Sequence, residues 1–234
     1  MSHYLIFIIL IAGMLGAVMA SKLTIPAALT GGVTGFLVYI GAGYAGISIM
    51  AAFFVIGSAA TSFKKDIKRK LNADEKHEGR RTAAQVLANS GVPAIFGLLS
   101  LFLYPKYETL LSVMIAASLA AAMGDTLSSE LGMVYGRRFF NILTIKRDQP
   151  GLDGVISLEG TLIGTAGSAI AAAIYAIGFG WHVGVFILIT IAGTTGNLAD
   201  SVFGAAFERK HYIGNNLINF LNTLVAALVA WGMY

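Results

Sequence analysis

Eight long apolar stretches separated by short polar connections constrain the fold of this 234-residue chain more than any other feature. A helix needs about 20 mostly apolar residues to cross a bilayer. Such a segment has to be helical there, because its backbone polar groups must bond to one another. We therefore predict an all-α, polytopic membrane protein of about eight transmembrane helices, organised as a single integral-membrane domain over residues 1–234. The predicted spans are residues 4–20, 24–41, 43–63, 82–104, 109–124, 155–177, 182–199 and 213–233.

The composition of the chain excludes most other classes of protein. Hydrophobic residues make up 56% of it and charged residues 12%, about half the charged fraction that is usual in a soluble domain. A soluble enzyme cannot bury so much apolar surface, and a disordered chain has the opposite composition. The sequence contains no cysteine, which excludes disulfides, zinc–thiolate sites and iron–sulfur clusters.

The basic residues are distributed asymmetrically along this series of spans. Of the 16 Lys and Arg residues, 15 follow odd-numbered spans, and Lys106 alone follows an even-numbered one. Basic residues in short loops mark the cytoplasmic side. We therefore predict cytoplasmic basic loops at 64–81 and 133–154, both termini outside and, in a prokaryote, a plasma-membrane location. Glycines at 41, 43 and 46 leave a re-entrant arrangement open for the second and third stretches, and the first stretch lacks the basic start of a signal peptide.

Three odd-numbered spans end in related segments, which indicates a weak internal repeat of the form helix, basic loop, helix. The segments are GSAATSFKK (57–65), GDTLSSELG (124–132) and GNLADSVFG (196–204), each with Gly first and Ser sixth. Glycine-interrupted polar helix ends are common around membrane binding sites. The alternative for the glycines is close packing between helices, but packing does not explain the acidic residues.

Four acidic residues lie within or beside apolar stretches, namely Asp125, Glu130, Glu159 and Asp200. A charge in a membrane helix costs at least a few kcal/mol, so such residues are functional candidates. The alternative is a buried ion pair with Lys or Arg. Carboxylate oxygens are the ligands that Mg²⁺ prefers, and we predict a catalytic metal site formed by Asp125, Glu130 and Asp200.

The even-numbered spans begin with amides and hydroxyls on the side where the basic residues lie. Exposed N–H groups at a helix N-terminus favour an anion, and arginine binds phosphate in a bidentate manner. Arg80 and Arg81 directly precede the fourth span, which places them better for a phosphate than the other basic residues. The predicted phosphate- and substrate-binding residues are Arg80, Arg81, Gln85, Asn89, Ser129, Ser157, Glu159, Ser201, Asn215 and Asn219.

Four stretches together resemble one family of integral membrane proteins, which includes the plant phytyl-phosphate kinase of vitamin E synthesis and uncharacterised prokaryotic members. They are EGRRTAAQVLANSGV (78–92), GDTLSSELG (124–132), GLDGVISLEGTLIGTAGS (151–168) and GNLADSVFGAAFE (196–208). The resemblance runs from about Ser58 onward, with departures at Asn197 and at Leu152–Asp153, where Asp153 is either an extra ligand or a loop acid. The matched positions include Arg80, Arg81, Gln85, Asn89, Asp125, Ser129, Glu130, Gly132, Gly154, Ser157, Gly160, Gly196, Asp200, Ser201 and Gly204.

The resemblance implies transfer of a phosphoryl group from a nucleoside triphosphate to a polyprenyl monophosphate, with Mg²⁺ as the expected cofactor. Two alternatives stay open: a CTP-dependent cytidylyltransferase that makes a CDP-activated lipid, to which GNLADSVFGAAFERK (196–210) is faintly similar, and a transporter of an anionic metabolite. The expected partners are the lipid bilayer, a prenyl phosphate and a nucleotide, without nucleic acid, and the sequence allows a homo-oligomer. Lys64, Lys65, Lys68 and Lys70 are predicted to anchor to anionic lipids as an alternative to a role in the site.

Overall fold

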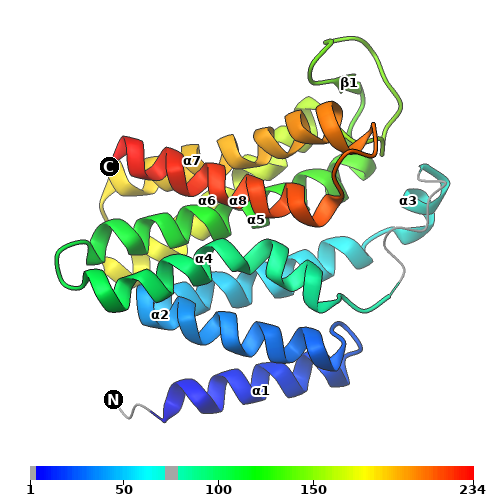
Figure 1. Cartoon of the computed structure of the whole chain (residues 1–234). Coiled ribbons are helices and arrows are strands. Elements are labelled where there is room, and N and C mark those ends of the chain that lie inside the picture. Colours follow the sequence, from blue (N-terminus) through cyan, green and yellow to red (C-terminus); the bar gives the residue numbers. More distant parts are fainter. Residues whose placement is uncertain (1–3, 72–78) are drawn as a thin grey trace.

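The fold is a bundle of long, roughly parallel helices, seen in a computed structural model that describes residues 4–71 and 79–234, without the side chains of residues 69–71 (Figure 1). The predicted role of Lys70 lies outside that part. The elements are α1 (Leu5–Met19), α2 (Ile25–Ser62), α3 (Lys65–Leu71), α4 (Ala83–Leu103), α5 (Glu108–Tyr135), β1 (Phe140–Asn141), β2 (Val155–Ile156), α6 (Leu158–Phe179), α7 (Val183–Phe203), the π-helix η1 (Gly204–Glu208) and α8 (Asn215–Met233).

The prediction of an all-α polytopic membrane protein is confirmed. Among the described residues, six helices are long and apolar enough to cross a bilayer: α2 and α4 to α8, with η1 extending α7. The apolar helix α1 has 15 residues and falls below that length. The number of crossings and the side on which the termini lie stay predictions.

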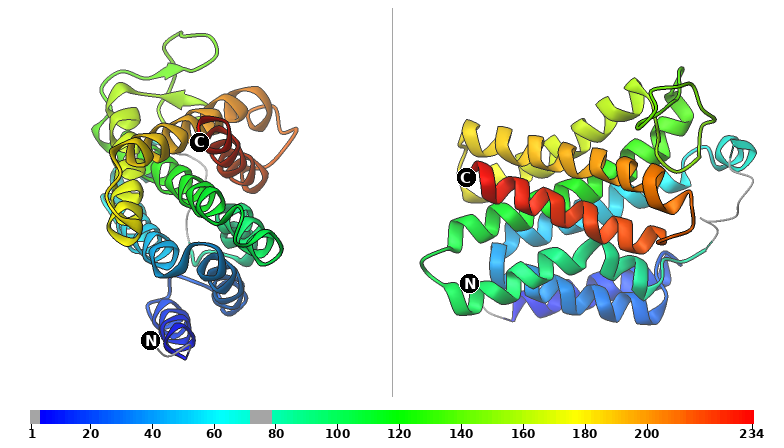
Figure 2. Two further views of the ribbon diagram at one scale, coloured as in Figure 1. Left: turned by 90° about the vertical axis from the view of Figure 1, so that its left-hand side faces the viewer. Right: turned by 45° about the horizontal axis from the view of Figure 1, so that its top comes forward.

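Helix α2 is divided at Gly43, where the backbone leaves the helical region with φ 56° and ψ −152°. A Cβ placed at Gly35 would lie 3.8 Å from a carbon of Ile47 and 3.7 Å from the sulfur of Met50. Residues 12 and 15 positions apart in a straight helix would be separated by about 18 Å or more. The two arms of α2 therefore lie side by side, and the chain reverses between the predicted second and third spans (Figures 1 and 2).

Helix α5 runs through the centre of the bundle and is almost entirely buried from Leu111 to Gly124. Small residues let the surrounding helices approach closely, which is how helices pack where lipid replaces water. A Cβ at Gly97 of α4 would lie 2.0 Å from the carbonyl oxygen of Leu37, and one at Gly124 would lie 2.9 Å from the carbonyl oxygen of Gly164. The packing alternative given for the repeat glycines therefore accounts for Gly124, and Gly97 shows the same close approach.

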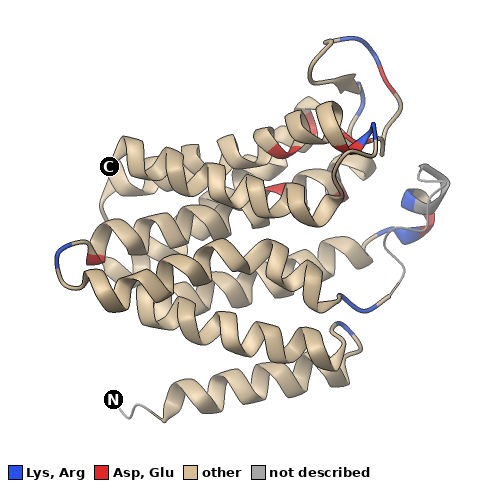
Figure 3. Cartoon of the chain, viewed as in Figure 1, with Lys and Arg blue, Asp and Glu red and all other residues tan. Residues whose placement is uncertain are grey.

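Two helices extend further than the predicted spans. Helix α5 continues to Tyr135, past the predicted end at residue 124, and α7 continues to Phe203 and into η1, past residue 199. The polar segments that follow these apolar runs are thus helical rather than loops, because their polar side chains face a pocket while the backbone stays hydrogen-bonded. Except for Lys106, the described Lys and Arg residues lie at this end of the bundle (Figure 3).

Candidate functional site

A pocket of about 430 Å³ lies at the basic end of the bundle, between α4, α5, α7, η1, α8 and the loop that precedes α6. Its lining contains twelve of the thirteen predicted site residues. Glu159 is the exception: it lies beside the pocket and accepts a hydrogen bond from the backbone N–H of Arg137 at 3.3 Å. The predicted residues in the lining are Arg80, Arg81, Gln85, Asn89, Asp125, Ser129, Glu130, Ser157, Asp200, Ser201, Asn215 and Asn219.

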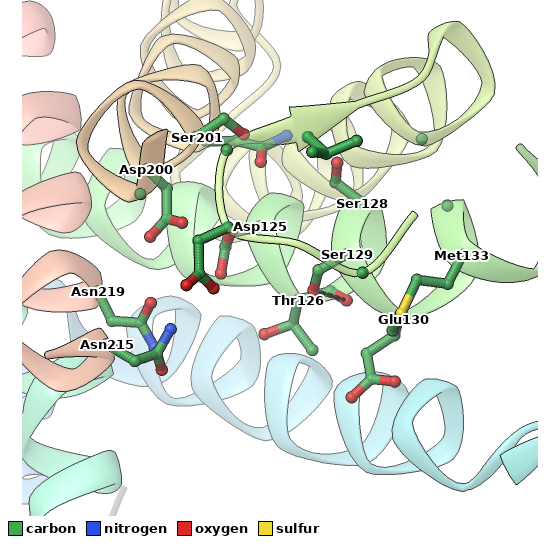
Figure 4. A pocket seen from close by; sticks show the side chains of 18 of the residues that line it. Asp125, Thr126, Ser128, Ser129, Glu130, Met133, Asp200, Ser201, Asn215 and Asn219 are labelled. Carbon is green, nitrogen blue, oxygen red and sulfur yellow. Dashed lines mark hydrogen bonds between the residues drawn. The ribbon is translucent and has the colours of Figure 1, made fainter. Parts of the chain in front are cut away.

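Two carboxylates from different helices converge in this pocket. Asp125 comes from α5 and Asp200 from α7, and their carboxylates point toward the same space, with Asn215 and Asn219 of α8 on one side of it (Figure 4). The amide nitrogen of Asn222 donates a 2.7 Å hydrogen bond to Asp200 and fixes its orientation. Two carboxylates that approach each other in a bilayer favour a bound cation, because otherwise their negative charges repel.

Three asparagines near these carboxylates present buried amide oxygens, those of Asn89, Asn219 and Asn222, that have no hydrogen-bond partner among the described residues. Their amide nitrogens are engaged: Asn89 donates to the backbone carbonyl of Gln85 at 2.9 Å, and Asn219 donates to Asn215 at 3.4 Å. A buried acceptor without a donor costs about 1–3 kcal/mol. The amide oxygens of Asn89 and Asn219, which line the pocket, therefore add to a donor set of oxygen atoms that suits a hard cation or hydrogen-bond donors of a ligand.

Glu130 does not join the two aspartates as the predicted third metal ligand. Its carboxylate forms a buried ion pair with Lys68 of α3 at 2.6 Å, and it points toward α2, away from Asp125 (Figure 4). Across the ranges that the structure describes, there is no group of three or more His, Asp or Glu side chains able to hold a metal ion. The ion-pair alternative from the sequence is therefore the one that Glu130 follows.

Lys68 is also not the lipid anchor that its place in a basic stretch predicts. Its ammonium group donates to the backbone carbonyls of Ala60 and Thr61 at 2.8 and 2.9 Å, besides Glu130. These carbonyls belong to the last turn of α2, where helix geometry leaves carbonyl groups without partners and favours a cation. The residue is only 7% exposed, so the predicted lipid contact of Lys68 is wrong, whereas Lys64 and Lys65 are exposed.

Arg80 and Arg81 reach the pocket from an extended segment that pairs with the connection between α1 and α2. The N–H of Arg81 donates to the carbonyl of Lys22 at 2.9 Å, and the carbonyl of Arg81 accepts from the N–H of Thr24 at 3.1 Å. The guanidinium of Arg81 lies 5.5 Å from the ring centre of Phe53, a cation–π contact. Burial lowers the pKa of Arg81, and the negative charge of Glu130 partly restores it. Arg80 is exposed and donates to Ser21 at 3.1 Å.

Several predicted ligands are partly engaged in local helix capping. Thr82 caps α4, and the side chain of Gln85 accepts from the backbone N–H of Thr82 at 2.8 Å in a reciprocal capping box. Ser157 caps α6 and accepts from the N–H of Gly160 at 3.0 Å. Ser129 donates to the carbonyl of Thr126 at 3.2 Å. Thr82 and Ser157 place the N-termini of α4 and α6 at the pocket, which supports anion binding by backbone groups more than by these side chains.

The structure adds acidic residues that the sequence reasoning passed over or left open. Glu208 of η1 and Asp153 of the loop before α6 both line the pocket. Glu208 lies eight residues after Asp200, a spacing of two helical turns that could have identified it. Gly154 has φ 75°, and a Cβ there would lie 2.3 Å from the Cβ of Ala205, so this loop packs directly on the π-helix. π-helical turns occur frequently at functional sites.

Comparison with known proteins identifies the family to which the chain belongs. Residues 6–227 match the family described as Integral membrane protein DUF92. Protein VTE6, chloroplastic, from Arabidopsis thaliana is 31% identical over 206 residues, covering 84% of this chain and 60% of the relative, so the chain spans about three fifths of that protein's length. The uncharacterised membrane proteins sll0875 of Synechocystis sp. and MJ0933 of Methanocaldococcus jannaschii are 30% and 31% identical, covering 86% of this chain and 78% and 82% of their own lengths. No solved structure matches the chain.

Proposed function

Because this chain belongs to the DUF92 family of integral membrane proteins, we propose that it is a membrane kinase that transfers a phosphoryl group from a nucleoside triphosphate to a prenyl monophosphate. The observation that carries the proposal is one pocket with an acidic and a basic pole. Asp125 and Asp200 converge on one side of it, and Arg80 and Arg81 reach it from the start of α4. The family resemblance of the four motifs, with the plant phytyl-phosphate kinase among its members, suggests the substrate class.

The donor set at the acidic pole fits Mg²⁺. It consists of carboxylate and amide oxygens, with no histidine in the pocket lining, and Mg²⁺ requires oxygen ligands and usually keeps several waters. We assign Asp125 and Asp200 to the metal, directly or through water, and leave Glu130 out because Lys68 holds it. Bound Mg²⁺ would neutralise charge on the nucleotide phosphates.

The residues of the chain supply positioning and charge in this mechanism. An ionised oxygen of the prenyl phosphate attacks the terminal phosphorus of the nucleotide, the bond to the bridging oxygen breaks, and a nucleoside diphosphate leaves with the released electron pair. The acceptor oxygen carries no proton that must be removed, so no general base is needed. Arg80 and Arg81 stabilise charge on the phosphate oxygens, while the prenyl chain stays in the bilayer.

Purified protein in lipid nanodiscs tests the proposal when it is given Mg²⁺, each of ATP, CTP, GTP and UTP, and prenyl monophosphates of several lengths, with products read by mass. We expect a prenyl diphosphate together with a nucleoside diphosphate. Release of pyrophosphate with a CDP-linked lipid would instead establish the cytidylyltransferase. If no nucleotide is consumed with any acceptor, the kinase proposal is overturned, and transport of an anionic metabolite becomes the alternative to test.

A further inference from the structure

Glu130 lies within electrostatic reach of two cations and is bonded to one of them. Its carboxylate accepts a 2.6 Å hydrogen bond from Lys68, and its charge also acts on Arg81, which lines the same pocket. Both members of the ion pair are nearly excluded from solvent, at 7% exposure for Lys68 and 6% for Glu130. A buried ion pair of this kind is costly to break from one side, because the remaining charge loses its partner.

The guanidinium of Arg81 is held by packing rather than by hydrogen bonds. The group stacks over Phe53, and a Cβ placed at Gly57 would lie 3.4 Å from its Nη2 atom. Within residues 4–71 and 79–234, the guanidinium donates no hydrogen bond to another residue. Thr126, one helical turn before Glu130, also packs near Gly57. A desolvated guanidinium beside the pocket is therefore kept available for an anion.

We propose that Lys68 is a positioning residue for Arg81: by holding Glu130, it prevents that carboxylate from capturing the guanidinium that binds substrate phosphate. The inference rests on the proposed function, since it takes a phosphate group as the ligand of Arg81. The phosphate belongs either to the nucleotide or to the prenyl acceptor, and both present the same chemistry to the guanidinium. Lys68 itself is not among the residues that line the pocket.

The expected result of removing Lys68 follows from this competition. In Lys68→Met, the Glu130 carboxylate loses the cation that holds it. Arg81 is close enough to replace that cation, because its guanidinium and Thr126, one turn before Glu130, both lie 3.4 Å from a Cβ placed at Gly57. Pairing between Glu130 and Arg81 would divert the guanidinium from the ligand, which we expect to raise the KM of one substrate by about 10- to 100-fold, the range for a lost hydrogen bond to a charged group. Removing the competing charge as well, in Lys68→Met/Glu130→Gln, should restore KM to within about threefold of wild type on the same reasoning.

The decisive experiment compares KM for each substrate, kcat and the melting temperature across these variants. Lys65→Met is the matched control, because Lys65 is exposed on the same short helix α3, and its KM should not change. A purely structural role for Lys68 would lower the melting temperature and the yield while leaving KM unchanged in the folded protein. In an Arg81→Gln background, Lys68→Met should raise KM no further. Independent, multiplying effects of the two substitutions on KM would overturn the inference.

Two further measurements keep the test decisive if Lys68→Met does not fold. Glu130→Gln alone leaves no carboxylate to compete with substrate phosphate for Arg81, so the KM of this variant should stay near wild type. A rise in KM above about tenfold would mean that Glu130 itself binds the ligand or the metal. Binding of inorganic pyrophosphate, measured by calorimetry, separates this inference from catalysis. If the wild type binds pyrophosphate through Arg81 and the variants follow the expected order, but no phosphoryl group is transferred, only the kinase proposal fails. If the wild type does not bind pyrophosphate, the inference about Lys68 fails too.

Discussion

The side-chain amide of Asn222 donates a 2.7 Å hydrogen bond to the carboxylate of Asp200 from the neighbouring helix. Asn222 is fully buried, so this bond sets which way Asp200 presents its oxygens to the pocket. Partners of metal-ligating groups typically change metal affinity or activity by about 10- to 100-fold when removed. We expect Asn222→Ala to raise the Mg²⁺ concentration needed for half-maximal turnover by a factor in that range.

A magnesium titration of turnover measures this effect. Asn216→Ala is the control, because Asn216 is exposed on the same helix α8 and does not line the pocket. An unchanged magnesium requirement in Asn222→Ala would contradict the assignment of Asp200 to the metal.

The two converging aspartates give the most direct test of the metal assignment. Asp125→Asn and Asp200→Asn keep the size of each side chain but remove its charge, so both proteins should fold while turnover falls by about 100-fold or more, as for other groups that stabilise a charged transition state. Glu108→Gln serves as the control, since Glu108 is exposed beside Lys106 at the opposite end of the bundle. Full activity in either aspartate variant would remove the metal assignment.

Much of this architecture is predictable from the sequence, because the length of the apolar stretches and the positions of the basic loops indicate membrane helices and their ends. The reversal at Gly43 follows the glycine-rich junction between two apolar runs. The convergence of Asp125 and Asp200 was also predictable, since an unpaired carboxylate in a membrane helix needs a polar surrounding.

The ion-pair partner of Glu130 was not predictable, because Lys68 lies 62 residues away on a short helix within a basic stretch. Nothing in that stretch distinguishes Lys68 from its exposed neighbours, and only the packing of α3 onto α5 selects it. Glu208 lies beyond the apolar run of α7 and was therefore passed over, although its spacing from Asp200 could have identified it; its place in the π-helix η1 is seen only in the structure.

Close packing between α2 and α4 predicts a specific loss of stability. A Cβ at Gly97 would lie 2.0 Å from the carbonyl oxygen of Leu37, which is backbone and cannot move aside easily. We expect Gly97→Ala to lower the melting temperature in detergent by at least about 3 °C, since overpacking costs about 1–3 kcal/mol. Gly13→Ala is the matched control, because nothing lies within 4 Å of a Cβ there, and its melting temperature should stay the same or rise.

The loop between α5 and α6, part of which lines the pocket, is held by an ion pair between Asp148 and Arg209. Arg209 belongs to the segment that follows η1. The hydrogen bonds from Arg209 hold the pKa of Asp148 below its usual value of 3.8. A lowered pKa in the folded protein stabilises it above the usual pKa, and this contribution is lost only as the pH falls through the lowered value. The Asp148–Arg209 ion pair is therefore intact at neutral and mildly acidic pH.

We expect Asp148→Asn to increase tryptic cleavage within this loop by up to about fivefold, since an exposed ion pair contributes about 0–1 kcal/mol. The cleavage sites are the exposed Arg137, Arg138, Lys146 and Arg147. Digestion followed by mass measurement of the fragments checks it, with Asp66→Asn as the control on a different segment. The wild-type rate per active trypsin should be the same at pH 7 and pH 8. Equal cleavage of Asp148→Asn and wild type would show that other contacts hold the loop.

The absence of cysteine from the chain makes its orientation directly testable. Single cysteines at Lys106 and Lys146 occupy exposed positions at opposite ends of the bundle. Because basic loops stay in the cytoplasm, a membrane-impermeant maleimide added to intact cells should label Lys106→Cys and should label Lys146→Cys only after permeabilisation. Tyr44→Cys, next to the reversal in α2, should label with Lys106→Cys if both arms of α2 cross the bilayer. Protection of Tyr44→Cys with normal labelling of Lys106→Cys would favour the re-entrant arrangement. Labelling of Lys146→Cys in intact cells, with Lys106→Cys labelled only after permeabilisation, would place the pocket on the outer side, where nucleoside triphosphates are scarce.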